Sequence, residues 1–164
     1  MARKKIMFVS HGNICRSPLA QALFERIAAE RGVAAEFEVD SAGVADYHIG
    51  EPVDPRMAQA AEQKGVHLKH TARRLKPSDL ENYDLILVMD RKNLDAIDEL
   101  TSDRALKRKV RLLRDFDPQK NGQEEVADPW YGGMRGFRET VEVIERTCST
   151  LLDELQTPHG VHPA

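Results

Sequence analysis

Two short, uninterrupted runs of apolar residues most constrain the fold of this chain. Residues 6–9 read Ile-Met-Phe-Val, and residues 85–89 read Leu-Ile-Leu-Val-Met. A strand with one face in solvent alternates apolar and polar residues, whereas a strand covered on both faces is apolar throughout. After each run, apolar residues recur at steps of three and four, which is typical of an amphipathic helix. We therefore predict a parallel sheet with helices packed on both of its faces.

Two weaker strands complete the predicted sheet, at residues 37–39 and 110–113. Helices are expected to begin around Ser17 and Asp54, because Ser and Asp are favoured N-caps and each is followed by a proline, which suits the first turn. A repeated alternation of strand and helix gives parallel strands joined by right-handed crossovers. The order of elements thus predicts a doubly wound, flavodoxin-like α/β fold with four parallel strands.

Length and charge restrict the class of protein. The chain has 164 residues, which suits one domain over residues 1–156 followed by a flexible tail at residues 157–164. The net charge of −3 argues against nucleic acid as a partner. Apolar runs fall far short of the roughly 20 residues that span a bilayer, so membrane insertion is not expected. Two cysteines cannot form a disulfide framework, and the expected location is the reducing cytoplasm.

The loop after the first strand has the composition of an anion-binding loop. It leads directly into a helix, whose N-terminus carries roughly half a positive charge. Gly12 is expected to allow a backbone conformation that a Cβ would resist, and Asn13 tolerates a left-handed conformation. Arg16 offers a planar fork for two oxygens of a phosphate. The loop lacks both the dinucleotide fingerprint and the Walker motif, so we predict an oxyanion site of another kind.

The same loop resembles that of the low-molecular-weight protein tyrosine phosphatases, which reads Val-Cys-x-Gly-Asn-Ile-Cys-Arg-Ser-Pro. Here the residues are Val9, Ser10, His11, Gly12, Asn13, Ile14, Cys15, Arg16, Ser17 and Pro18. Further motifs follow in family order and cover nearly the whole chain: residues 40–42, 49–56, 70–73, 89–94, 117–120 and 128–132. The resemblance implies a phosphatase that hydrolyses phosphotyrosine and aryl phosphates through a phosphoenzyme, with no cofactor and no metal.

One position departs from the family's pattern. The family's nucleophile is the first cysteine of the loop, and Ser10 stands at that position here. A thiolate in such a loop would have a lowered pKa and would attack phosphorus, whereas a serine hydroxyl stays protonated and needs a base. We therefore expect Ser10 to preserve phosphate or substrate binding and nearly abolish turnover. Both an introduced Cys-to-Ser change and a natural pseudophosphatase fit this residue.

The remaining roles are what the resemblance implies. Arg16 is expected to clamp the phosphoryl group and stabilise its equatorial oxygens. Asp128 matches the general acid that protonates the leaving tyrosine oxygen and later activates water. Ser17 would hydrogen-bond the nucleophile. The backbone N–H groups that complete the cradle would come from His11, Gly12, Asn13, Ile14, Cys15 and Arg16.

Aromatic and supporting residues complete the predicted site. Trp130 and Tyr131 are expected to form one wall for the phosphotyrosine ring, with Tyr47 opposite. His70 and Asp90 resemble a supporting pair that orders the site. The expected partners are therefore a phosphotyrosine protein or peptide and inorganic phosphate or a similar oxyanion.

Three other functions compete with a tyrosine phosphatase. An arsenate reductase has the same fold and loop but needs further cysteines, and residues 75–100 contain none. A phosphoarginine phosphatase would, by resemblance, carry Thr at the position of Ile14 and would lack the aromatic pair at residues 130 and 131. A noncatalytic module that binds phosphotyrosine or phosphate is compatible with Ser10.

Overall fold

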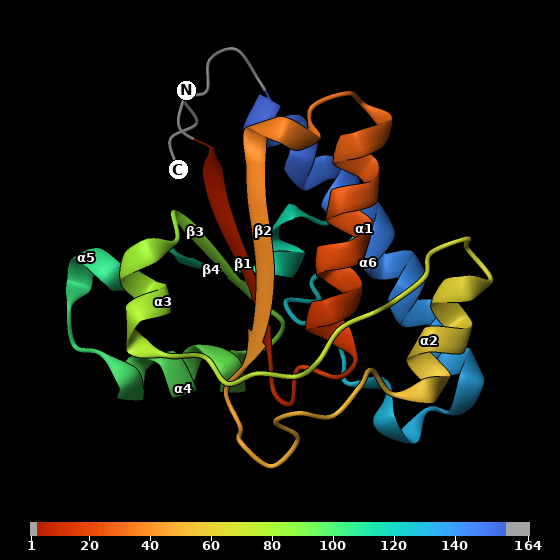
Figure 1. Ribbon diagram of the computed structural model, residues 1–164, viewed down its shortest axis with the longest axis horizontal. Helices are drawn as coiled ribbons and strands as arrows, with labels where there is room; N and C mark the ends of the chain where they lie inside the picture. Colours follow the sequence, from red (N-terminus) through yellow and green to blue (C-terminus); the bar gives the residue numbers. More distant parts are fainter. Residues whose placement is uncertain (1–2, 157–164) are drawn as a thin grey trace.

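The structure, a computed structural model, describes residues 3–156. Its centre is a parallel sheet in the order β2-β1-β3-β4 (Figure 1). The strands are β1 (Lys4–Ser10), β2 (Phe37–Gly43), β3 (Leu85–Val88) and β4 (Val110–Leu112). The predicted α/β class with four parallel strands and helices on both faces is confirmed. The predicted tail at residues 157–164 lies outside the described residues.

The strand order places the end of β1 at the centre of one sheet edge. From β1 the chain passes first to β2 on one side and later to β3 on the other, so the winding direction reverses beside β1. Register brings Ser10 level with Gly43, and Val9 level with Val88. Ligands of doubly wound sheets bind beyond the carboxyl ends of the strands at such a reversal. The loop that follows β1 therefore occupies the favoured position for a site.

Helices cover both faces of the sheet (Figure 1). On one face α1 (Arg16–Glu30) packs against the long α6 (Gly133–Gln156), and α2 (Pro55–Glu62) packs on α6 beside them. The other face carries the shorter helices α3 (Pro77–Asn82), α4 (Arg91–Leu100) and α5 (Arg104–Lys107). Three 3₁₀ turns complete the elements: η1 (Ala34–Glu36), η2 (Leu113–Phe116) and η3 (Pro129–Tyr131). No helix within residues 3–156 is long and apolar enough to cross a membrane.

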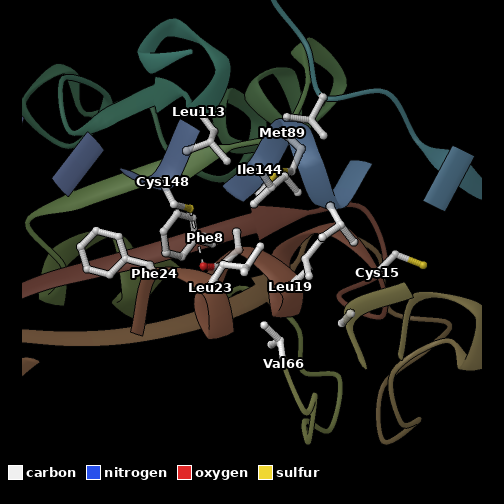
Figure 2. Close-up of a cluster of buried hydrophobic side chains, with 14 of the residues drawn as sticks. Phe8, Cys15, Leu19, Leu23, Phe24, Val66, Met89, Leu113, Ile144 and Cys148 are labelled. Carbon is white, nitrogen blue, oxygen red and sulfur yellow. Dashed lines mark hydrogen bonds between the residues drawn. The ribbon is translucent and has the colours of Figure 1, made fainter. Parts of the chain in front are cut away.

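Alternate side chains of β1 supply the two cores, as expected for a strand buried on both faces. Ile6 and Phe8 join the cluster formed with α1 and α6, while Met7 and Val9 face the cluster on the other side of the sheet. Figure 2 shows the first cluster, which includes Phe8 of β1 and Cys148 of α6. The Cys148 thiol is fully buried and its pKa is raised by burial, so it is a structural group.

The predicted start of the first helix is wrong by two residues. Helix α1 begins at Arg16 with Cys15 at the N-cap, and no side chain caps it. The hydroxyl of Ser17 instead lies 2.5 Å from the Ser10 hydroxyl and accepts a hydrogen bond from Asn13. A residue whose side chain holds the preceding loop is not available as a cap. The second prediction holds, because Asp54 caps α2 by accepting from the backbone N–H of Arg56.

Candidate active site

The loop that joins β1 to α1 forms the floor of a cavity of about 290 Å³. Its walls come from the segments that follow β2 and precede α6, so three regions far apart in the sequence meet at one sheet edge. The residues that line the cavity are Ser10, His11, Gly12, Asn13, Ile14, Cys15, Arg16, Tyr47, His48, Asp128, Trp130 and Tyr131. Of the predicted site residues, Ser17, His70 and Asp90 lie behind this lining and contact it.

Asn13 fixes the shape of the loop. Its backbone is left-handed, with φ of 59°, as its residue type predicts. Its amide nitrogen donates to the hydroxyls of Ser17 at 2.8 Å and Ser41 at 3.1 Å. Its carbonyl oxygen accepts from His70 Nε2 at 2.8 Å and from the backbone N–H of Arg73 at 2.9 Å. A buried side chain thus ties the loop to β2 and to the segment before α3.

Gly12 matters for a different reason than the sequence predicts. Its φ is not in the left-handed region, so the expectation of a special backbone conformation is wrong. A Cβ on Gly12 would instead lie 2.7 Å from the imidazole of His48. Gly43 supports the loop from below, where a Cβ would lie 2.8 Å from the carbonyl oxygen of His11. Gly12 therefore lets the ring of His48 pack against the loop, and Gly43 lets the end of β2 pack against it.

The backbone N–H groups of the loop are free to bind an anion. From His11 through Arg16, none of them donates to an acceptor within residues 3–156. The 15-residue helix α1 begins at the same point and directs its N-terminus at the loop. Successive unpaired N–H groups at a helix N-terminus favour negatively charged ligands. The floor of the cavity is therefore suited to an oxyanion.

Arg16 adds a positive charge to this floor, and its guanidinium group is fixed in place by two hydrogen bonds. The side chain is buried, and its Nη1 donates to Asp90 Oδ2 at 2.9 Å and to the carbonyl oxygen of Val126 at 2.8 Å. Asp90 is itself oriented, because its second oxygen accepts the backbone N–H of Asn93. One guanidinium nitrogen is thus used for anchoring, which leaves Nε and Nη2 for a ligand.

Ser10 and Cys15 are the two candidates for a nucleophile on this floor. Ser10 is buried, and its hydroxyl contacts that of Ser17 at 2.5 Å. Burial, with smaller contributions from Asp54 and Asp128, raises the pKa of the Cys15 thiol to about 12. Cys15 is therefore a neutral thiol at physiological pH and a poor nucleophile.

Asp128 begins the turn that forms one wall. Its side chain accepts the backbone N–H of Trp130 at 3.0 Å and so caps η3. The carboxylate remains exposed and lines the cavity. The Asp-Pro sequence that looks like a simple turn is thus a capped turn, which presents the aspartate and the indole side by side.

Aromatic rings surround the mouth of the cavity. Tyr47 hydrogen-bonds through its hydroxyl to His11 Nε2. His48, which the sequence analysis missed, lies between Tyr47 and Trp130, with ring centroids at 4.7 and 6.3 Å respectively. Tyr131 is 95% exposed, so it contributes an edge rather than a packed wall. A His next to the predicted Tyr47 in a polar loop was the only sequence signal for the missed residue.

His70 and Asp90, predicted as a supporting pair that orders the site, each contact the lining at a different point. His70 holds the loop through Asn13, whereas Asp90 holds Arg16. Burial is the main cause that lowers the pKa of His70, with Arg73 acting in the same direction against Asp40. A neutral imidazole donating from Nε2 suits the carbonyl oxygen of Asn13. The two residues therefore support different parts of the site.

Comparison with known proteins agrees with this geometry. The family model described as low molecular weight phosphotyrosine protein phosphatase matches residues 5–159. A low molecular weight protein-tyrosine-phosphatase of Streptomyces coelicolor is 39% identical over 149 residues, which covers 90% of this chain and 91% of that protein.

Two solved structures are similar over the same range. The protein tyrosine phosphatase of Entamoeba histolytica, with Hepes in its active site, has a TM-score of 0.89 at 32% identity and covers 93% of this chain and 97% of its own. A Cys-to-Ser mutant of an arginine phosphatase, with its active-site serine phosphorylated, has a TM-score of 0.84 at 29% identity and covers 93% and 96%. With a family model that matches residues 5–159, a relative 39% identical and similar solved structures, the chain belongs to the low molecular weight phosphotyrosine protein phosphatase family.

Proposed function

We propose that this protein binds phosphotyrosine and other aryl phosphates in the cavity above the loop, with Ser10 at the position of the attacking nucleophile. The observation that carries the proposal is the loop from Ser10 to Arg16, where unpaired N–H groups and an anchored guanidinium converge. The related Entamoeba enzyme holds Hepes, a sulfonate, in its active site, which agrees with a tetrahedral oxyanion at this place.

The reaction of an active form follows from these groups. The nucleophile at position 10 forms a bond to phosphorus while the bond from phosphorus to the aryl oxygen breaks, and Asp128 gives its proton to that oxygen. Water then attacks the phosphoenzyme, Asp128 takes a proton from it, and phosphate and the nucleophile are regenerated. Arg16 and the loop N–H groups bind the equatorial oxygens, whose charge must be stabilised in both steps.

Ser10 prevents efficient turnover in this scheme. A serine hydroxyl must lose its proton to attack, and its contact within the described residues is the hydroxyl of Ser17, which is not a base at neutral pH. Binding depends on other groups and is retained. The related arginine phosphatase mutant carries phosphate on the serine of its active site, so a phosphoserine can be accommodated in such a site.

The aromatic mouth favours an aryl phosphate over phosphoarginine. Two of the similar solved structures are arginine phosphatases, so this second substrate is a real alternative. Tyr47 and Trp130 line the cavity and supply aromatic rings for a bound phenyl group. The apolar Ile14 lines the floor. A planar aryl group gains stacking energy on the faces of such rings, and the resemblance assigns Thr rather than Ile at the position of Ile14 to phosphoarginine phosphatases.

The test compares this protein with its Ser10→Cys variant. We expect both proteins to bind inorganic phosphate with similar affinity, and Ser10→Cys to hydrolyse 4-nitrophenyl phosphate at least 10³-fold faster. Ser102→Cys, which adds a thiol at an exposed position, is the matched control and should stay inactive. Phosphotyrosine and phosphoarginine peptides given to Ser10→Cys then decide the substrate class.

Two outcomes would contradict the proposal. If Ser10→Cys is inactive and neither protein binds phosphate, the loop is only a turn. If this protein hydrolyses 4-nitrophenyl phosphate as fast as Ser10→Cys does, Ser10 is a competent nucleophile and the predicted loss of activity is wrong. Mass spectrometry of the protein after incubation with 4-nitrophenyl phosphate shows whether Ser10 has reacted, because a phosphate trapped on Ser10 adds the mass of one phosphoryl group.

A further inference from the structure

Arg56, in the first turn of α2, lies between two aromatic rings. Its guanidinium carbon is 4.8 Å from the ring centroid of Trp130 and 4.6 Å from that of Phe137, at the start of α6. A guanidinium on an aromatic face is attracted by the ring quadrupole and also packs as a flat surface. Helix α2 lies beside α6 in Figure 1, and this arginine is a contact between them.

The same guanidinium makes hydrogen bonds in two directions. Nη1 donates to the carbonyl oxygen of Trp130 at 3.1 Å. Nε and Nη2 donate to the two oxygens of Asp54 at 3.3 and 3.1 Å, which is the bidentate geometry that arginine forms and lysine cannot. Arg56 therefore joins the turn that carries Trp130 to the cap of α2.

Asp54 extends this connection to the anion-binding loop. It is 6% exposed, and its backbone N–H donates to the carbonyl oxygen of Ile14 at 2.8 Å. At the other end, the backbone N–H of Trp130 donates to Asp128. Hydrogen bonds thus run from Ile14 through Asp54 and Arg56 to the turn of Asp128, linking the floor of the cavity to its wall.

We propose that Arg56 is a positioning residue, which fixes the turn from Asp128 to Trp130 at the distance from the loop that proton transfer to the leaving group needs. The role of Asp128 as proton donor rests on the proposed function, but the fixing of the turn does not. Arg56 lies outside the cavity lining and acts through Asp54 and the carbonyl of Trp130. Catalytic geometry tolerates errors of only a fraction of an ångström, so a loosened turn would slow the chemical step.

The first test needs no activity. Trp130 is the only tryptophan of the chain, so its fluorescence reports on this turn alone. We expect Arg56→Gln to raise the acrylamide quenching constant at least twofold, and Arg56→Lys to raise it nearly as much because lysine cannot hold both oxygens and the ring. Arg111→Gln is the matched control, since Arg111 lies over the ring of Phe116 at 4.5 Å on strand β4. Unchanged quenching in Arg56→Gln overturns the proposal.

The second test uses the Ser10→Cys background and two substrates. A 4-nitrophenolate leaves without much help, whereas phenolate needs the proton of Asp128. We expect Arg56→Gln to lower kcat/KM at least tenfold for phenyl phosphate and less than threefold for 4-nitrophenyl phosphate, with phosphate affinity unchanged. The ratio kcat/KM is compared because it reports phosphoenzyme formation and excludes the later hydrolysis, in which Asp128 also acts. Asp128→Asn should show the same selectivity in kcat/KM, and the double variant should be no worse than Asp128→Asn alone.

The outcomes distinguish the two proposals. Equal losses for both substrates, a weakened affinity for phosphate, or full rescue by Arg56→Lys would mean that Arg56 acts as a charge on the bound anion, which overturns a positioning role. Inactivity of Ser10→Cys itself contradicts the proposed function. In that case the quenching experiment still decides whether Arg56 fixes the turn.

Discussion

Replacement of Asn13 tests how the anion-binding loop is held. In Asn13→Ala, the donors His70 Nε2 and the backbone N–H of Arg73 lose the carbonyl oxygen they share, at 2.8 and 2.9 Å in the native protein. Each donor loses its closest acceptor, at a cost of about 1–2 kcal/mol, although His70 Nε2 keeps a longer contact to Ser41 Oγ at 3.3 Å. Alanine must also adopt the left-handed backbone of residue 13, where φ is 59°, which costs about 1 kcal/mol. We expect the free energy of unfolding to fall by about 3–5 kcal/mol.

A glycine at the same position separates the two contributions. Asn13→Gly removes the same hydrogen bonds but adopts positive φ without strain, so it should be about 1 kcal/mol more stable than Asn13→Ala. Urea unfolding followed by far-ultraviolet circular dichroism measures both. The exposed and also left-handed Asn121 provides the control, because Asn121→Ala carries the backbone cost without the buried contacts. A loss below 1 kcal/mol in Asn13→Ala would refute the reasoning.

Three further perturbations test the cavity and the packing around it. Gly43→Ala places a Cβ 2.8 Å from a carbonyl of the loop, so phosphate affinity, measured by calorimetry, should fall at least tenfold. Burial alone would raise the pKa of Asp117, but hydrogen bonds from Arg146 and Arg114 lower it below its usual value of 3.8. The ionised Asp117 therefore stabilises the folded protein at neutral pH, and this contribution is lost as the pH falls below 3.8. Asp117→Asn should therefore cost about 3 kcal/mol at pH 7 and flatten the acid limb of the stability curve; an unchanged limb would contradict this. With its pKa raised to about 12, the Cys15 thiol is ionised in only about one molecule in 10⁴ at pH 8. Iodoacetamide should therefore leave Cys15 unmodified over hours, whereas the thiol introduced at position 10 by Ser10→Cys is labelled in that time.

The sheet and the helix order were predictable because both depend on patterns local to the chain. The apolar run at residues 6–9 became β1, with its side chains divided between two cores. The motif Asp54-Pro55 became the start of α2 because a cap needs only neighbouring residues. The short helices α3 and α5 were missed, since a turn or two of helix leaves no clear periodicity.

The details of the site depended on contacts between distant segments. The hydroxyl of Ser17 was predicted to cap α1, but it faces Ser10 because Asn13 folds the loop back over it. Gly12 was predicted to allow an unusual backbone conformation, but a side chain is excluded there because the imidazole of His48 occupies the space. Asn13 itself was predicted well, since the tolerance of asparagine for positive φ is a property of the residue alone.

The amino-acid sequence by itself determined which residues could form an anion-binding loop and where the strands lie, and it predicts the nucleophile position at Ser10. Only the tertiary structure decided how the loop is completed. In the folded protein His70 supports Asn13, whereas Asp90 supports Arg16. His48 lies in the wall of the cavity, and Arg56 lies between Trp130 and Phe137. Periodicity and capping act over a few residues, so they can be read along the chain. The contact of Arg56 with Trp130 and the ion pair of Arg16 with Asp90 each join residues 74 positions apart, and such partners are fixed only when the helices pack on the sheet.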